Sequence, residues 1–247
     1  MNLEGHQRDW EELAQLDPLW AILSAPGTRL GGWQLDEFLA TGRPDVERLM
    51  SRAAQFKRPE HRRRALDFGC GVGRHAQLLA EHFDEVVGVD VSEEMVRLAR
   101  RFGAGVDGLE FVVNCGPRLA GFGDGEFDLV HSVLVLQHLP GEEAILGYIG
   151  ELARVLSPGG LLFFQVPVAA NRRRRLEGRR RLYGALRRTG LSADILYRRL
   201  GLNPVRMSSA APERIDACLR EAGVDVLAID PMPVGEGYDS RAWWAGR

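Results

Sequence analysis

The chain has 247 residues, of which 45% are hydrophobic and 27% charged, and its formal net charge is −2. This composition and length are typical of a soluble globular protein with a sizeable core, and they fit one domain with additions better than two full domains. No apolar run approaches membrane-spanning length, the N-terminus lacks a signal-peptide pattern, and the three cysteines have no metal-ligand spacing. We therefore expect a reduced, cytoplasmic protein without a zinc site.

Residues 1–60 are predicted to form a helical cap. Apolar side chains recur at near-helical spacing over residues 10–23, with a proline as a break. A further helix is predicted from residue 44 through residue 50, because a proline and an acid stand in its first turn. Trp33 and Phe38 lie between these helices, and they either cover a ligand cleft or belong to the core.

Residues 65–74 combine the end of a strand, an acid and three alternate glycines. They read Ala-Leu-Asp-Phe-Gly-Cys-Gly-Val-Gly-Arg. We predict a strand, a tight turn that requires glycine, and a helix leading from Gly73 to Ala80. The N–H groups at the start of that helix can receive a ligand carboxylate or phosphate. A dinucleotide site would have G-x-G-x-x-G in place of this G-x-G-x-G, and an ordinary glycine-rich turn is the other alternative.

The pattern resembles the first motif of class I S-adenosylmethionine-dependent methyltransferases. The resemblance implies that the acid and the glycines hold the methionine end of the cofactor, S-adenosylmethionine. The cofactor-binding candidates from this motif are Asp67, Gly69, Cys70, Gly71, Gly73 and Arg74.

A second apolar strand, 85–90, ends in Asp90. In a doubly wound domain this carboxylate lies at the carboxyl end of the strand, where it can accept both ribose hydroxyls of a nucleoside. An acidic helix cap is the alternative, but Ser92 is itself a good N-cap for the next helix. Asp90 is therefore free for the ligand, and we place it with its neighbour Val91 in the cofactor site.

A third strand is predicted at 109–113, with Asn114 and Cys115 at its end. Members of the superfamily often have Asp-Ala here, where the acid binds the adenine amino group. An Asn side chain has both an acceptor and a donor, so Asn114 can still pair with an adenine edge, and either it or Cys115 takes that place. A simple turn before Gly116 is the alternative.

Residues 125–140 resemble the fourth strand and exit loop of the same superfamily, and 152–160 resemble the turn before its fifth strand, which we place at 161–166. The resemblance covers about residues 64–168. Ser132 at the end of the fourth strand is a further cofactor-binding candidate. His138 follows that strand at the carboxyl edge, where ligands bind in such sheets, and it is our candidate general base. A packed histidine of the following turn is the alternative.

Arginines cluster in a predicted helical insertion at about residues 169–210. They are Arg172 to Arg175, Arg179 to Arg181, Arg187, Arg188, Arg198 and Arg199, opposed by only Glu177 and Asp194. One hypothesis is recognition of an anionic acceptor, namely a phosphorylated or carboxylated small molecule, a carrier-tethered acyl group or RNA. We favour a solvated helix pair whose inward-facing residues are Leu176, Leu182, Tyr183, Leu186, Leu191, Ile195, Leu196 and Leu200. No aromatic-interleaved RNA module is present, which argues against nucleic acid.

The C-terminal part is predicted to complete the sheet, with a helix at 212–222 and strands at 224–229 and 238–245. This finish resembles the antiparallel hairpin of the methyltransferase sheet, which NAD-binding domains lack. We therefore predict an α/β protein with a three-layer, Rossmann-like methyltransferase fold and a seven-stranded, mostly parallel sheet. Residues 61–247 form the S-adenosylmethionine-binding domain.

The predicted function is methyl transfer from S-adenosylmethionine to an O, N or C nucleophile of a small molecule, leaving S-adenosylhomocysteine. The sulfonium methyl is already activated, so the protein mainly aligns donor and acceptor and excludes water. We expect an acceptor that could be anionic, no metal, no membrane partner, and a monomer or homodimer. A non-catalytic S-adenosylmethionine-binding sensor or partner protein is the alternative, and RNA methylation is less favoured.

Overall fold

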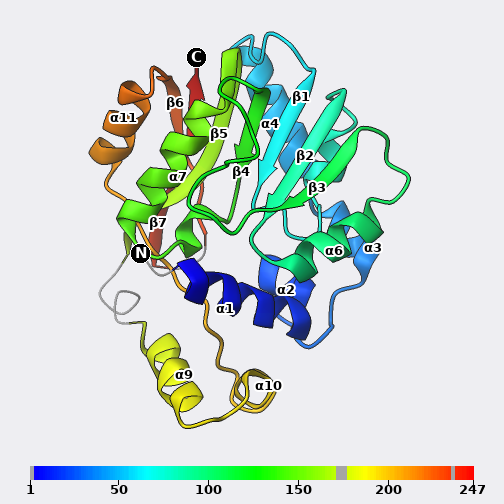
Figure 1. The fold of residues 1–247 in the computed structure, drawn as a ribbon, viewed down its shortest axis with the longest axis vertical. Coiled ribbons are helices and arrows are strands. Elements are labelled where there is room, and N and C mark those ends of the chain that lie inside the picture. Colours follow the sequence, from blue (N-terminus) through cyan, green and yellow to red (C-terminus); the bar gives the residue numbers. More distant parts are fainter. Residues whose placement is uncertain (1–2, 171–176, 235–236) are drawn as a thin grey trace.

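The computed structural model describes residues 3–170, 177–234 and 237–247, which form three layers around one sheet (Figure 1). The sheet has seven strands in the order β3-β2-β1-β4-β5-β7-β6. Strands β1 to β5 run parallel, and β7 is antiparallel to both of its neighbours. The predicted fold class is confirmed, including the C-terminal hairpin. The strands are β1 Arg64–Phe68, β2 Glu85–Asp90, β3 Leu109–Val113, β4 Phe127–Ser132, β5 Leu156–Ala170, β6 Asp225–Pro231 and β7 Tyr238–Gly246.

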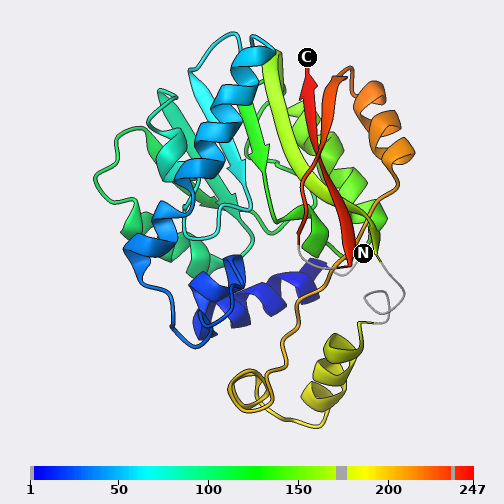
Figure 2. The same ribbon diagram turned by 180° about the vertical axis from the view of Figure 1, so that it is seen from behind.

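Helices cover both faces of the sheet (Figure 1, Figure 2). Side chains of the central strands alternate between two hydrophobic clusters: Leu66 and Val130 pack with one helical layer, and Ala65 and Leu129 pack with the other. This alternation buries both faces, as expected of parallel strands. In the described ranges, no helix is both long and apolar enough to cross a membrane. The layers are α7 Glu142–Arg154 with α11 Pro212–Glu221, and α4 Arg43–Gln55 with α5 Ala76–Leu79 and α6 Glu93–Phe102.

The turn after β1 differs from the prediction, because α5 begins at Ala76 and not at Gly73. Gly73 has a φ of +86°, which an α-helix cannot include. A Cβ on Gly73 would also lie 2.7 Å from the Phe111 ring. This glycine therefore delays the helix and lets the turn pack closely against β3.

Three helices of the N-terminal region lie at the carboxyl ends of the parallel strands (Figure 1). They are α1 Leu3–Leu16, α2 Pro18–Ile22 and α3 Leu35–Ala40. Leu13 of α1 and Phe38 of α3 share a hydrophobic cluster with Val72 of the glycine turn and Met95 of α6. Within residues 1–60, the first three helices therefore cover the edge of the sheet, whereas α4 covers one of its faces.

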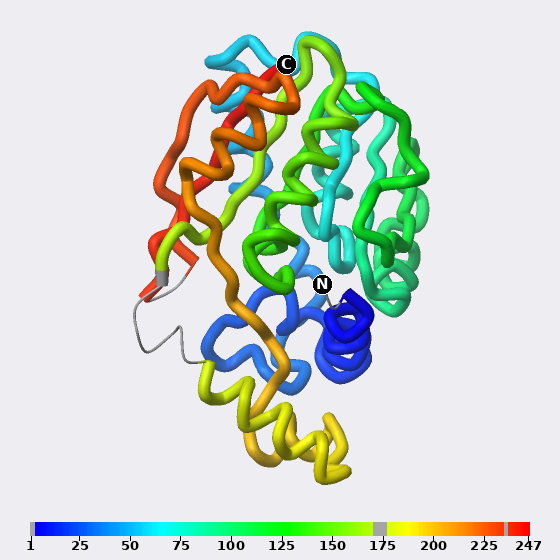
Figure 3. The backbone as a smooth tube through the Cα atoms, turned by 60° about the vertical axis from the view of Figure 1, so that its left-hand side comes forward, coloured from blue at the N-terminus to red at the C-terminus, as the bar shows by residue number. Residues whose placement is uncertain are grey.

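Helices α9 (Gly178–Arg188) and α10 (Ala193–Arg198) form an arm at the far end of the molecule, beyond α1 (Figure 3). Tyr183, Leu196 and Leu202 make the arm's small buried cluster. The Tyr183 hydroxyl also donates a hydrogen bond to Glu12 of α1 at 3.1 Å. The arm thus has its own minor core and is joined to α1 by this polar contact and by Tyr197 of α10, which is buried in the same hydrophobic cluster as Leu13.

The predicted inward orientation of Leu182, Ile195 and Leu200 is wrong, since each is at least 43% exposed. The arm consists of two short helices around one small buried cluster, and no other described element packs against its outer side. Several arginines of the arm hold it together: Arg179 donates to the Gly201 carbonyl at 2.6 Å, and Arg198 pairs with Asp194 at 2.6 Å. Arg172 to Arg175 and Leu176 lie outside the described residues.

Candidate cofactor and active site

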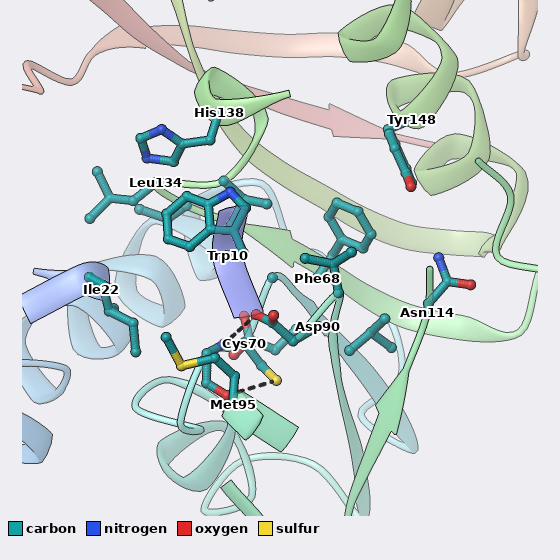
Figure 4. A pocket seen from close by; sticks show the side chains of 18 of the residues that line it. Trp10, Ile22, Phe68, Cys70, Asp90, Met95, Asn114, Leu134, His138 and Tyr148 are labelled. Atoms are coloured by element: carbon teal, nitrogen blue, oxygen red, sulfur yellow. Dashed lines mark hydrogen bonds between the residues drawn. The ribbon is translucent and has the colours of Figure 1, made fainter. Parts of the chain in front are cut away.

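A cavity lies between the carboxyl edge of the sheet and α1 (Figure 4), and it holds about 970 Å³ of empty space when its opening is included. Gly73 and Ser132 do not line it, because Gly73 packs on Phe111 and Ser132 is fully buried. The predicted residues that do line it are Asp67, Gly69, Cys70, Gly71, Arg74, Asp90, Val91, Asn114, Cys115 and His138.

Asp90 ends β2 with its carboxylate against the glycine turn. One oxygen accepts the Gly71 N–H at 2.9 Å, and the other accepts the Ser92 N–H at 3.0 Å. Burial raises the pKa of Asp90, although these two donors oppose that effect. A carboxylate offers about four acceptor positions, so one position remains on each oxygen. Ser92 caps α6 through the Met95 N–H, as predicted, so Asp90 is not needed as a cap.

Gly71 brings the backbone directly to the cavity wall. Its φ of +53° lies in the left-handed region, and a Cβ here would meet the Ile22 side chain at 2.5 Å. Ile22 belongs to α2 and lines the same cavity. The glycine turn therefore forms part of the cavity wall and packs directly against α2.

Asn114 takes part in the local turn that was the alternative to adenine binding, and its adenine role stays a prediction. Its side-chain amide donates to the Gly116 carbonyl at 3.1 Å, which holds the local turn. Because the amide uses its N–H₂ group here, its oxygen remains available to accept a donor such as the adenine amino group. Phe68 and Tyr148, whose rings are 5.0 Å apart, line the same part of the cavity.

The first motif lies on a buried polar network. Asp67 is 3% exposed and its carboxylate is 2.8 Å from Nδ1 of His131. Burial raises the pKa of Asp67, but the hydrogen bond with His131 and the charges of His131, His75 and Arg74 together lower it below its usual value. Arg74 pairs with Asp45 at 3.0 Å, while its Nε has no hydrogen-bond partner among the described residues. The network therefore offers the cavity a carboxylate and a guanidinium with a spare donor.

Asp67, His75 and His131 offer ligand atoms that all lie within 4.8 Å of one another, a spacing that could hold a metal ion. However, Asp67 is bonded to His131, and His75 lies 3.3 Å from an oxygen of Asp45. Burial lowers the pKa of His75 to about 4, and the charge of Arg74 acts in the same direction. The same charge would repel a cation, so we interpret the group as a hydrogen-bonded network; that the chain needs no metal stays a prediction.

His138 lies in the short 3₁₀ helix η1 (Leu136–His138) after β4, on the cavity wall. Its Nδ1 is 2.7 Å from the Arg206 carbonyl oxygen, which can only accept, so Nδ1 carries the proton. Nε2 lies 3.2 Å from the Gln137 amide nitrogen and has its lone pair on that side. Burial lowers the pKa of His138 to about 4. The imidazole is therefore neutral at pH 7, in the tautomer that a base acting through Nε2 requires.

The residues that α1 contributes to the cavity wall could not be identified from the sequence. Leu3, His6 and Trp10 all line the cavity, and the Trp10 ring meets His138 edge-on at 5.1 Å. The helical spacing correctly identifies Trp10 as an apolar-face residue, but it does not distinguish a cavity from a core. Trp33 and Phe38, the predicted alternatives for a cover, do not line the cavity.

A smaller crevice opens on the other side of His6, Trp10 and His138. Its remaining lining residues are Asp9 and Leu13 of α1 and residues 204–206. The side chains of Asp9 and Arg206 are partly buried, and neither forms a hydrogen bond or ion pair with a described residue. Three residues thus separate the cofactor-side cavity from a second space, which is lined by the carboxylate of Asp9 and the guanidinium of Arg206, two charges that attract each other.

The cavity fits S-adenosylmethionine on three observations. Asp90 keeps two acceptor positions for ribose hydroxyls, the unpartnered Nε of Arg74 can meet a carboxylate, and the turn at Gly71 leaves no room for a side chain.

Comparisons with known proteins agree with this geometry. Residues 66–164 match the model of the methyltransferase domain family. Ubiquinone biosynthesis O-methyltransferase of Xanthomonas oryzae pv. oryzae is 36% identical over 106 residues, which is 40% of this chain and 41% of that protein. The 2-methyl-6-phytyl-1,4-hydroquinone methyltransferase of Synechocystis sp. is 36% identical over 98 residues, 39% of this chain and 30% of that protein.

The fold is also similar to that of a solved structure, magnesium protoporphyrin IX methyltransferase from Synechocystis PCC 6803 with bound S-adenosylhomocysteine. The TM-score is 0.65 at 20% identity, with 99% of both chains covered. The sequence matches to the curated relatives span less than half of their length. The family model, at residues 66–164, spans β1 to β4 and most of β5, and it includes neither α1 nor the arm.

Proposed function

We propose that this chain, a class I S-adenosylmethionine-dependent methyltransferase by its motifs, its fold and its matching domain, methylates a small molecule. The observation that carries the proposal is Asp90, whose two oxygens are fixed by the Gly71 and Ser92 N–H groups and still face the cavity. That arrangement suits a pair of ribose hydroxyls, and a dinucleotide pattern of glycines is absent from this turn.

Each part of the cofactor has residues of suitable chemistry. Asp90 would accept the ribose hydroxyls, and Asn114 would accept the adenine amino group. Asp67 would attract the ammonium group of the methionine end, and Arg74 would attract its carboxylate. When bound, the cofactor supplies an activated sulfonium methyl. The protein's own task is then to align the acceptor and to exclude water.

The acceptor is expected on the α1 side of the cavity, against Trp10, His6 and His138. Neutral His138 would remove a proton from the acceptor through Nε2, which would exchange its hydrogen bond with the Gln137 amide for one with the acceptor. The Nδ1 proton would remain on the ring and donate to the Arg206 carbonyl. Burial also lowers the pKa of His6 to about 4, so both histidines face the acceptor uncharged at pH 7. An acceptor that reaches the crevice would meet the charged side chains of Asp9 and Arg206.

The similarity to an O-methyltransferase of ubiquinone biosynthesis and to a hydroquinone methyltransferase supports a small-molecule acceptor. The crevice carries one charge of each sign, and the arginines Arg179 and Arg198 are engaged within the arm. An anionic acceptor therefore stays a prediction, and a polar one is the broader expectation.

Incubation with radiolabelled S-adenosylmethionine and a panel of hydroxylated, amine and carbon-nucleophile acceptors tests the proposal. Labelled product with release of S-adenosylhomocysteine is expected for at least one class. Tight binding of S-adenosylhomocysteine without transfer to any acceptor would instead favour a non-catalytic binding protein.

A further inference from the structure

We propose that Glu11 is a positioning residue that holds α1 closed over the cofactor by fastening it to the loop that carries Asp90. The inference rests on the proposed function, since it assigns α1 a role in retaining that cofactor. Glu11 does not line the cavity and no motif of the sequence includes it.

The contact is a chain of hydrogen bonds between α1 and the ribose-binding carboxylate. An oxygen of Glu11 accepts the Ser92 hydroxyl at 2.6 Å and the Glu94 N–H at 3.2 Å. The N–H of the same Ser92 donates to Asp90 at 3.0 Å. Ser92 is fully buried, so neither of its bonds competes with solvent. Movement of α1 away from α6 would break the bonds to Glu11 and loosen the loop that orients Asp90.

The position of Glu11 on α1 makes this contact relevant to the ligand. Trp10 lies beside it in the sequence and faces the cavity. Gln7, one helical turn earlier, donates to Sγ of Cys115 at 2.9 Å at the adenine end of the site. The carboxylate of Glu11 also sits at the N-terminus of α6, where a negative charge is favoured. One face of α1 is therefore fixed to the cofactor half of the molecule.

The adjacent carboxylate fixes α1 in another direction. Glu12 accepts the Tyr183 hydroxyl at 3.1 Å and pairs with Arg187, both residues of α9. Both acids are partly exposed residues of the same helix turn. Glu12 is thus a matched control, because its loss should remove the polar contact between α1 and α9 and leave the contact with the Asp90 loop in place.

The experiment measures the affinity and dissociation rate of S-adenosylhomocysteine for the full-length protein and for Glu11→Ala, Glu11→Gln and Glu12→Ala. Glu11→Ala is expected to weaken binding about tenfold, mainly through faster dissociation, because a charge-assisted hydrogen bond is lost. Glu11→Gln keeps an acceptor oxygen for Ser92 and should recover most of the affinity. Glu12→Ala should stay within about twofold of the unchanged protein.

Hydrogen exchange adds a readout that a general loss of stability would not give. With S-adenosylhomocysteine bound, Glu11→Ala should speed exchange in residues 3–16 and leave β1 and β4 protected. If Glu11→Ala leaves the affinity for S-adenosylhomocysteine unchanged, the inference about Glu11 is wrong and the proposed function still stands. The same conclusion follows if Glu11→Ala and Glu12→Ala weaken binding equally. If the unchanged protein does not bind S-adenosylhomocysteine, the proposed function fails and the inference fails with it.

Discussion

Replacement of Asp90 by Ala should weaken the binding of S-adenosylhomocysteine by about 1.5–3 kcal/mol, the range for hydrogen bonds to a charged group. The geometry supports this magnitude because each carboxylate oxygen is already fixed by one N–H donor, at 2.9 Å and 3.0 Å, and has one position left. Both ribose hydroxyls lose their acceptor in the variant. The expected rise in Kd is about 10- to 150-fold.

The same substitution has a predictable cost for the fold. The Gly71 and Ser92 N–H groups lose their acceptor, and an unsatisfied buried donor costs about 1–3 kcal/mol. Affinity must therefore be measured by calorimetry well below the unfolding temperature of the variant, with circular dichroism to establish that it is folded. Asp107→Ala, at an exposed acid remote from the cavity, is the matched control and should leave Kd unchanged. A folded Asp90→Ala protein with unaltered affinity would remove Asp90 from the site.

Three further outcomes follow from the cavity. Gly71→Val should abolish S-adenosylhomocysteine binding while the circular dichroism of the sheet persists, because the branched side chain meets Ile22 and is strained at a φ of +53°. Retained binding would place the ligand elsewhere. His138→Gln should lower kcat by about 100-fold or more with cofactor affinity unchanged, and an unaltered kcat would end its role as a base. Burial lowers the pKa of His6, His75 and His138 to about 4 in the folded protein, whereas histidines of an unfolded chain take up a proton near pH 6.5. The unfolded state therefore binds more protons between these values, and the free energy of unfolding should fall as the pH drops from about 6.5 towards 4. Thermal unfolding midpoints that do not change between pH 7 and pH 5 would contradict the buried, neutral state of these rings.

The cofactor half of the site could be predicted because its residues follow strands in order along the chain. Parallel strands bring their carboxyl ends to one edge, so Asp67, Asp90 and Asn114 meet there whatever the rest of the chain does. The same rule places His138 at that edge. Strand ends and glycine turns are local features, and local patterns in the sequence report them.

The rest of the site depends on contacts that no local pattern contains. Trp10 reaches His138 across 128 positions of sequence, and its helical spacing is equally typical of a core residue. Ser132 was predicted from its place at a strand end, yet it is fully buried within the sheet and does not line the cavity. Leu182 of the arm is exposed for a similar reason. An amphipathic pattern identifies the apolar face of a helix, but it does not show whether another element packs against that face.

The central claim is that the cavity between α1 and the carboxyl edge of the sheet binds S-adenosylmethionine. The most direct test is a calorimetric titration of the unaltered protein with S-adenosylhomocysteine and, separately, with NAD. We predict one S-adenosylhomocysteine bound per chain and no binding of NAD. Binding of NAD, or the absence of S-adenosylhomocysteine binding by the folded protein, would contradict the claim.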